Sequence, residues 1–214
     1  MSDAPSSLQR FVAVVPVKPP AHGKSRLVGL SDEARQSLAA AFALDTVLAC
    51  ARSASVAEVL VVTDDAAFSS RLAALGTQCL PDGASGDLNA TLRQAVAEAR
   101  RRWPQLAPVA LCADLPALLA ADLDAALGSV DLDRPAFVAD AAGVGTTLYT
   151  AAYDAFAPRF GGGSRAAHLG AGATPVEGDL RSLRRDVDDL TDLADARTLG
   201  VGLHTHAAIS TLGL

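Results

Sequence analysis

The sequence predicts an α/β domain that covers residues 1–214 and has a mainly parallel sheet with helices on both faces. Three observations support this prediction. The chain has 214 residues, and 50% of them are hydrophobic, which is enough for one sizeable core. Short β-branched runs alternate with longer amphipathic segments, as in proteins built from βαβ units. The sequence contains no internal repeat and no long Ser/Gly linker that would mark a second domain.

The first half of the chain contains four expected strands with helices between them. A β-branched run predicts a strand at 11–17, and a Pro/Gly loop then leads to a long helix over about 31–52. The same alternation continues with strand 56–63, helix 66–75, strand 78–80, helix 88–102, strand 107–113 and helix 116–128. This order is typical of a doubly wound parallel sheet.

The second half of the chain departs from this alternation after Pro135. Two short strands are expected, at 136–140 and 146–150, followed by a glycine cluster and further helical segments. Ligands of open α/β sheets bind at the carboxyl ends of the strands, where the strand order reverses. Residues that directly follow a strand are therefore the first candidates for function.

Charge and composition exclude several classes of partner. The net charge is −6 and the longest basic run is 100–102, so binding to nucleic acid is not expected. Apolar runs such as 38–44 are far shorter than the roughly 18 residues of a membrane helix, and the start of the sequence lacks the pattern of a signal peptide. Cys50, Cys79 and Cys112 lack C-x-x-C spacing and suit reduced core thiols. We therefore expect a cytoplasmic protein that does not bind membranes.

The loop after the first strand contains both lysines of a chain that has sixteen arginines. It includes Gly-Lys-Ser, as a Walker A loop does, but Lys18 stands where that motif needs its first glycine. Pro19 and Pro20 lack backbone N–H groups, so the loop cannot form a nest of amides around a phosphate. Lys18, Lys24 and Arg26 could instead bind a polyphosphate through side-chain charge. The alternative is a loop whose cations only face water.

Aspartates at two places suggest a metal site. Asp114 follows the fourth long strand, and Asp186 and Asp188 are two residues apart, which puts both side chains on the same side of an extended chain. Together they would form an all-oxygen site of the kind that Mg²⁺ prefers when it also binds substrate phosphates. The alternative is helix capping, by Asp114 for the next helix and by Asp188 or Asp189 for a helix near residue 190.

A glycine-rich segment suggests an anion site. The three glycines at 161–163 lead into Ser164 at an expected helix start, which allows close approach of the backbone to an anion. Thr146 and Thr147 begin a strand nearby and can donate hydroxyl protons. A flexible loop is the alternative for the glycines.

A turn that enters the expected helix at 88–102 carries Asn89 and could line a nucleoside. Asp, Gly and Asn also dominate ordinary turns, so this pattern alone is not specific. The four histidines show no ligand or triad pattern, and no serine lies in a nucleophile elbow.

These motifs, in this order, resemble the phosphoenolpyruvate and 2-phospho-L-lactate guanylyltransferases of coenzyme F-420 biosynthesis, a branch of the nucleotidyltransferases. The resemblance spans nearly the whole chain. It rests on PVK and GKSRL near the N-terminus, VVTDD (61–65), GDLN (86–89), ADLPAL (113–118), GTT with GGGS, and DVDD (186–189). It implies a three-layer α/β/α Rossmann-like nucleotidyltransferase fold with a mixed, mainly parallel sheet. Related molybdenum-cofactor and sugar nucleotidyltransferases usually begin with a GxGxR loop, which this chain lacks.

The resemblance also implies a reaction. The phosphate of phosphoenolpyruvate would attack the α-phosphorus of GTP, releasing pyrophosphate and leaving enolpyruvoyl-2-diphospho-5'-guanosine. The alanine and arginine bias suggests an actinobacterial source and so favours phosphoenolpyruvate over 2-phospho-L-lactate. Transfer to a sugar phosphate or pterin, and a module that binds nucleotide without catalysis, are the alternatives. The next enzyme of the pathway is a further candidate partner.

Carried over by motif, the resemblance assigns roles to single residues. Three carboxylates would hold Mg²⁺: Asp114, Asp186 and Asp188. Three residues would hold the phosphoenolpyruvate: Thr146, Gly161 and Ser164. Five would bind the nucleotide: Lys18, Lys24, Arg26, Asp64 and Asn89. The catalytic residues expected among these are Lys18, Lys24 and Asp114.

Overall fold

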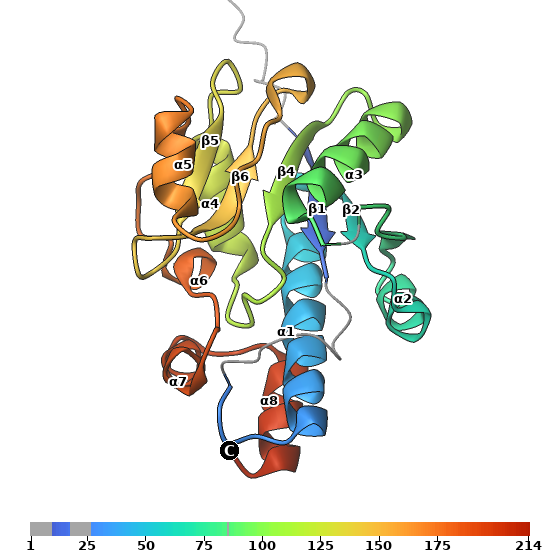
Figure 1. Ribbon diagram of the computed structural model, residues 1–214, viewed down its shortest axis with the longest axis vertical. Coiled ribbons are helices and arrows are strands. Elements are labelled where there is room, and N and C mark those ends of the chain that lie inside the picture. Colours follow the sequence, from blue (N-terminus) through green and yellow to red (C-terminus); the bar gives the residue numbers. More distant parts are fainter. Residues whose placement is uncertain (1–9, 18–26, 85) are drawn as a thin grey trace, which may run out of the picture.

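A seven-stranded mixed sheet lies at the centre of the part of the chain that the computed structural model describes, namely residues 10–17, 27–84 and 86–214 (Figure 1). Its strands are β1 (Phe11–Pro16), β2 (Val56–Val62), β3 (Gln78–Leu80), β4 (Ala107–Leu111), β5 (Ala136–Ala139), β6 (Thr146–Thr150) and β7 (Thr174–Pro175). The helices are α1 (Asp32–Arg52), α2 (Ala66–Ala73), α3 (Leu88–Arg102), α4 (Ala120–Gly128), the short 3₁₀ helix η2 (Tyr153–Ala155), α5 (Ser164–Gly170), α6 (Arg181–Arg184), α7 (Leu190–Leu199) and α8 (Leu203–Leu212).

The strand order β3-β2-β1-β4-β6-β5-β7 places the reversal of chain direction across the sheet between β1 and β4. β1 pairs in parallel with both β2 and β4, whereas β6 pairs antiparallel with β4 and β5. Because β6 runs against its neighbours, its first residue, Thr146, lies at the same edge as the carboxyl end of β4. The mixed, mainly parallel sheet predicted from the sequence is confirmed.

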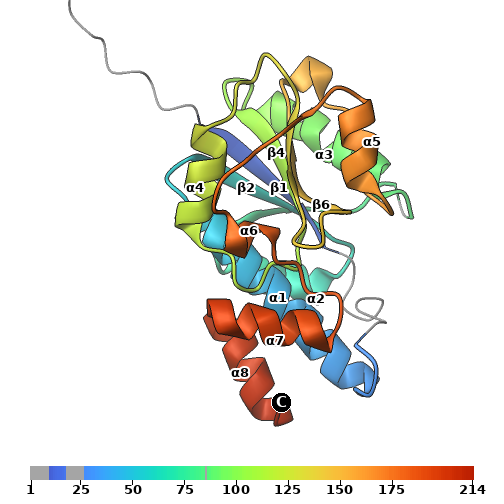
Figure 2. The ribbon, with the colours of Figure 1, turned by 90° about the vertical axis from the view of Figure 1, so that its left-hand side faces the viewer.

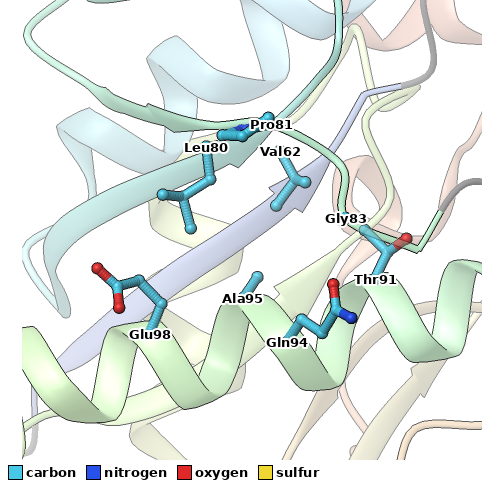
Figure 3. Close-up of a pocket in the computed structure, with 8 residues that line it drawn as sticks. All are labelled: Val62, Leu80, Pro81, Gly83, Thr91, Gln94, Ala95 and Glu98. Carbon is cyan, nitrogen blue, oxygen red and sulfur yellow. The ribbon is translucent and has the colours of Figure 1, made fainter.

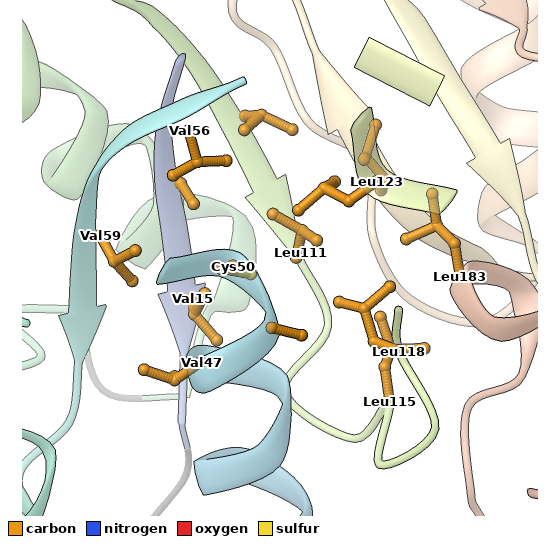
Figure 4. Packing of buried hydrophobic residues seen from close by; sticks show 14 of the residues in the cluster. Val15, Val47, Cys50, Val56, Val59, Leu111, Leu115, Leu118, Leu123 and Leu183 are labelled. Carbon is orange, nitrogen blue, oxygen red and sulfur yellow. The ribbon is translucent and has the colours of Figure 1, made fainter. Parts of the chain in front are cut away.

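Helices cover both faces of the sheet (Figures 1 and 2). Alternation along β1 sends Ala13 and Val15 toward α1 and α4, and Val12 and Val14 toward α3. The first of these clusters is drawn in Figure 4, where Cys50 of α1 lies among the valines of β1 and β2. Burial raises the pKa of the Cys50 thiol to about 12, as expected of a reduced core thiol.

Helix α1 extends past the carboxyl edge of the sheet and forms a second packing surface beyond it (Figure 2). Its 21 residues span about 32 Å, and its N-terminal half packs against α7 and α8 in a separate apolar cluster that includes Phe42 and Ile209. The buried Asp45 accepts backbone hydrogen bonds from His204 (3.1 Å) and Thr205 (2.7 Å) at the start of α8. A carboxylate in the middle of α1 therefore caps α8.

The structure corrects the predicted elements mainly around β4. This strand ends at Leu111, and α4 begins at Ala120, not at Pro116. The Pro116 carbonyl accepts a hydrogen bond from the Gly202 backbone N–H (2.9 Å), so a contact with a distant segment competes with the expected helix. The N-cap of α4 is Leu119, so Asp114 does not cap this helix.

None of the helices in the described ranges is both long enough and apolar enough to cross a membrane.

Replacing Asp45 by Ala is expected to lower the free energy of unfolding by about 2 kcal/mol, because two buried N–H groups of α8 lose their acceptor. The control is Asp45→Asn, which keeps one carbonyl oxygen as an acceptor and should lose less. Urea denaturation followed by circular dichroism measures both. An Ala variant as stable as the wild type would show that Asp45 does not hold α8 in place.

Candidate functional site

Four carboxylates gather at the carboxyl edge of the sheet. Asp114 follows β4, Asp140 follows β5, and Asp186 and Asp188 lie between α6 and α7. The pKa of Asp186 is raised to about 7, first because the carboxyl is largely removed from water and then because the charges of Asp114, Asp140 and Asp188 repel its ionised form. Asp186 is therefore close enough to each of the other three carboxylates to be affected by its charge.

Backbone and hydroxyl contacts fix the turn that carries Asp114. The hydroxyl of Thr46, buried in α1, accepts a hydrogen bond from the Leu115 N–H (3.0 Å) and lies 3.2 Å from the Ala113 carbonyl. On the other side, the Val187 N–H donates to the Asp114 carbonyl (3.0 Å). This last bond joins the segment of Asp186 and Asp188 directly to the turn after β4.

Arg184 joins the same segment to β5. Its guanidinium donates to the carbonyl oxygens of Ala139 (3.1 Å) and Val176 (2.9 Å), and its own carbonyl accepts from the Ala141 N–H (2.8 Å). These three bonds hold the end of α6 against the end of β5. Asp186 is thereby brought near Asp140.

Of Asp188 and Asp189, the structure shows which one caps α7. Asp189 caps α7 by accepting from the N–H groups of Thr191 (2.8 Å) and Asp192 (3.0 Å). Asp192 accepts in return from the N–H groups of Asp188 (3.1 Å) and Asp189 (3.2 Å). The Asp188 carboxylate therefore does not cap α7.

The carboxylates do not form a closed metal cage. Within the described ranges, no group of three or more His, Cys, Asp or Glu side chains is arranged to hold a metal ion. Mg²⁺ usually binds through one or two carboxylates together with water and substrate phosphates. The oxygen chemistry of Asp114, Asp186 and Asp188 fits such a partial site, which phosphate oxygens would complete.

A turn ending at Thr146 forms the second part of the site. The Asp140 carboxylate accepts from the N–H groups of Val144 (2.9 Å) and Gly145 (2.7 Å), and a Cβ at Gly145 would clash with it. The Thr146 carbonyl lies 3.3 Å from the sulfur of Cys112, just past the end of β4. Thr146 therefore lies at the strand end that leads to Asp114.

The glycine-rich loop lies beside Thr146. Gly161 (φ +136°) and Gly163 (φ +70°) adopt backbone conformations that favour glycine, and the buried Ser164 then begins α5. The Arg165 N–H donates to the Val144 carbonyl (3.1 Å), which joins α5 to the turn before Thr146. The predicted acceptor residues Thr146, Gly161 and Ser164 thus belong to one corner of the sheet edge.

Asn89 holds the chain that enters this loop. Its amide nitrogen donates to the Phe160 carbonyl (2.9 Å) and its amide oxygen accepts from the Phe160 N–H (2.8 Å). The sequence analysis assigns Asn89 to the nucleotide, and that assignment stays a prediction. The structure adds a role in fixing the glycine-rich loop.

Asp64 fixes the turn that precedes α3. It accepts from the Asp82 N–H (2.8 Å), and Asp82 accepts in turn from the Ala84 N–H (2.9 Å) and the Thr91 hydroxyl (2.6 Å). A pocket of about 180 Å³ lies between this turn, the ends of β2 and β3, and α3 (Figure 3). It is lined by Val62, Leu80, Pro81, Gly83, Thr91, Gln94, Ala95 and Glu98. The role of Asp64 in nucleotide binding also stays a prediction.

Two sets of residues complete the comparison with the sequence analysis. The predicted phosphate ligands Lys18, Lys24 and Arg26 lie outside the described residues. Sequence patterns did not reveal the contacts of Thr46 and Asp140, or that of His168, whose Nδ1 lies 3.0 Å from the Thr146 hydroxyl oxygen. No motif marks Thr46 or His168, whereas an aspartate at a strand end before a Gly-containing turn is a signal that could have pointed to Asp140.

The sheet topology and the polar groups at its carboxyl edge define a protein with the nucleotidyltransferase fold. The structure is similar to 4-diphosphocytidyl-2C-methyl-D-erythritol synthase from Anaerococcus prevotii, with a TM-score of 0.61 and 8% identity over 89% of this chain and 95% of that one. A Methanothermobacter nucleotidyl transferase matches with a TM-score of 0.57 and 18% identity over 88% and 96%. At such identities these similarities concern the fold alone.

The chain belongs to the guanylyl transferase CofC-like family, whose model matches residues 11–210. A relative from Thermomonospora curvata, named phosphoenolpyruvate guanylyltransferase, is 48% identical over 91% of this chain and 86% of its own length. A protein of the same name from Streptomyces coelicolor is 45% identical over 95% and 97%. The family resemblance noted in the sequence is confirmed.

Asn89→Ala is expected to raise the KM of the acceptor about tenfold, because the Phe160 peptide loses both hydrogen bonds and the glycine-rich loop loosens. The KM of GTP should change about twofold or less. Steady-state kinetics with each substrate varied in turn makes the comparison. The opposite split, with only the KM of GTP raised, would assign Asn89 to the nucleotide instead.

Asp186→Asn is expected to stabilise the metal-free protein at pH 8. The raised pKa means that the folded state keeps a proton that the unfolded state releases near pH 4, so this contribution to stability is full below pH 4 and lost as the pH rises through about 7. A shift of this size corresponds to ~4 kcal/mol, and we expect about 2 kcal/mol because the carboxyl is partly exposed.

Thermal unfolding of the wild type and of Asp186→Asn in EDTA, at pH 5 and at pH 8, measures this difference in stability. The matched control is Asp133→Asn, which changes an exposed aspartate outside the carboxylate cluster. Equal unfolding free energies for wild type and Asp186→Asn at pH 8 would show that the cluster does not store repulsion.

Proposed function

We propose that this protein transfers the guanylyl group of GTP to the phosphate of phosphoenolpyruvate, forming enolpyruvoyl-2-diphospho-5'-guanosine and pyrophosphate. The observation that carries this proposal is the meeting of a carboxylate cluster with Thr146 and the glycine-rich loop at one edge of the sheet. Membership of the guanylyl transferase family and the names of the relatives support it.

In this reaction the protein would position the acceptor phosphate and neutralise the charge of the triphosphate. A phosphate oxygen of the acceptor is already a competent nucleophile, so no covalent intermediate with the protein is needed. Thr146, Ser164 and the backbone at Gly161 would hold the acceptor so that this oxygen faces the α-phosphorus of GTP. Lys18 and Lys24 would offset the charge of the triphosphate, with the pyrophosphate leaving on the far side.

The carboxylate cluster would complete the site together with Mg²⁺, which when bound offsets phosphate charge and makes the α-phosphorus more electrophilic. Asp114, Asp186 and Asp188 are the residues that would hold it. The repulsion that Asp114 and Asp188 exert on ionised Asp186 would favour the binding of a cation. Arg26 and Asp64 would contact the nucleotide, and Asn89 would act on the acceptor side through the glycine-rich loop that it fixes.

The acceptor and the cellular setting are further parts of the proposal. 2-Phospho-L-lactate is the alternative acceptor, because it offers the same phosphate and carboxylate. The product would pass to the next enzyme of coenzyme F-420 biosynthesis. We propose a cytoplasmic location, since the three cysteines are free thiols that suit a reducing compartment.

Release of pyrophosphate from GTP and Mg²⁺ is expected with phosphoenolpyruvate and to a smaller extent with 2-phospho-L-lactate. Asp114→Asn should lower kcat at least about a hundredfold while the fold persists, because the contacts that fix this turn are made by its backbone. A coupled pyrophosphate assay and circular dichroism measure both effects, with Asp133→Asn as the control. No release with either acceptor, or full activity of Asp114→Asn, would overturn the proposal.

A further inference from the structure

His168 is a buried residue that contacts both Thr146 and the chain that enters the glycine-rich loop. It lies in α5, is 0% exposed, and its two ring nitrogens point to different segments. Nδ1 lies 3.0 Å from the hydroxyl oxygen of Thr146. Nε2 lies 2.9 Å from the backbone nitrogen of Arg159, at the entrance to the glycine-rich loop.

The contact with Arg159 fixes the protonation of the ring. A backbone N–H can only donate, so Nε2 of His168 must carry a lone pair and accept. The single ring proton therefore lies on Nδ1, and a doubly protonated ring would set two N–H groups against each other. Burial lowers the pKa of His168 to about 4 and keeps the ring neutral near pH 7, although a hydrogen bond with the Ser164 backbone raises this pKa; the charge of Arg159 adds to the lowering.

Aromatic neighbours hold the ring in this orientation. Tyr149 and Phe137 stack on it at centroid distances of 4.7 and 5.5 Å, and Phe160 meets it edge-on at 5.7 Å. A ring flip would exchange Nδ1 and Nε2 for carbon atoms and break both hydrogen bonds. The stacked rings oppose that motion because the core is close-packed.

The orientation of His168 decides what Thr146 can do. Since Nδ1 carries the proton, it has no lone pair to accept the Thr146 hydroxyl proton, which must point elsewhere. Within the described ranges, His168 is the only hydrogen-bond partner of that hydroxyl. Thr146 is therefore left as a donor at the edge of the sheet where the acceptor would bind.

We propose that His168 is the positioning residue of the acceptor site: it orients the Thr146 hydroxyl as a hydrogen-bond donor to the acceptor anion and fixes the entrance to the glycine-rich loop. This inference rests on the proposed function for the identity of the anion. A hydroxyl with a directed proton favours an anion, which only accepts, over a ligand group that donates. The tautomer itself follows from the contacts of His168 alone.

The tautomer is tested first, by ¹H–¹⁵N correlation of the histidine rings in the wild-type protein at pH 7. His168 is expected to show a protonated Nδ1 and a bare Nε2, with the exposed His206 as the reference ring and His168→Phe to assign the signal. A protonated Nε2 would overturn the inference even in an active enzyme.

The link to Thr146 is tested by a double-mutant cycle. Thr146→Val and His168→Phe should each raise the KM of phosphoenolpyruvate about tenfold and change the KM of GTP about twofold or less. The double variant should fall well short of the roughly hundredfold rise that two independent effects would give, because most of the effect of His168 passes through Thr146 and only its bond to Arg159 acts separately. If the effects of the two substitutions multiplied independently, or if both KM values changed equally, the role of His168 would be merely structural. Either result would overturn the inference.

Two further comparisons guard against misfolding and against an error in the proposed function. His168→Asn can place an amide N–H near the position of Nδ1, so its KM for phosphoenolpyruvate should be nearer the wild-type value than that of His168→Phe. A value equal to that of His168→Phe or higher would count against the inference. His206→Phe should match the wild type. If the wild type used neither phosphoenolpyruvate nor 2-phospho-L-lactate, the acceptor role would fail with the proposed function while the tautomer could still be observed.

Discussion

At the carboxyl edge of the sheet, Asp186 is largely buried and lies within reach of the charges of three other carboxylates. Asp114, Asp140, Asp186 and Asp188 would separate if only their charges acted, and the raised pKa of Asp186 reports first the burial of its carboxyl and then the charges of the other three. The backbone bond from Val187 to Asp114 opposes this repulsion directly. The fold thus gathers negative charge where a bound cation would relieve the repulsion.

Helix α1 supplies much of the support for this arrangement. The neighbouring residues Asp45 and Thr46 support different parts of the structure. Asp45 caps α8, and Thr46 fixes the turn that carries Asp114. The C-terminal helices pack on the part of α1 that extends beyond the sheet, and the chain between α6 and α7 can then return to β4. One long helix therefore connects the stability of the C-terminal region to the geometry of the site.

Local patterns allowed much of the fold to be predicted from the sequence. Short β-branched runs identified the strands, and Asp189 was one of two candidates for the cap of α7. The predicted start of α4 was wrong because the Pro116 carbonyl accepts a hydrogen bond from the backbone N–H of Gly202, far along the chain. Thr46 and His168 act on residues 69 and 22 positions away, so only the folded chain reveals them.

The carboxylate cluster and the corner formed by Thr146, Gly161 and Ser164 are proposed to form one site for a cation and a phosphorylated acid. A crystal structure with Mn²⁺ and phosphoenolpyruvate, with the metal located by its anomalous signal, tests it most directly. We expect the metal bound to oxygens of Asp114 and Asp186, and a phosphoenolpyruvate oxygen within hydrogen-bond distance of the Thr146 hydroxyl. A metal bound elsewhere, or an acceptor remote from Thr146, would contradict the account.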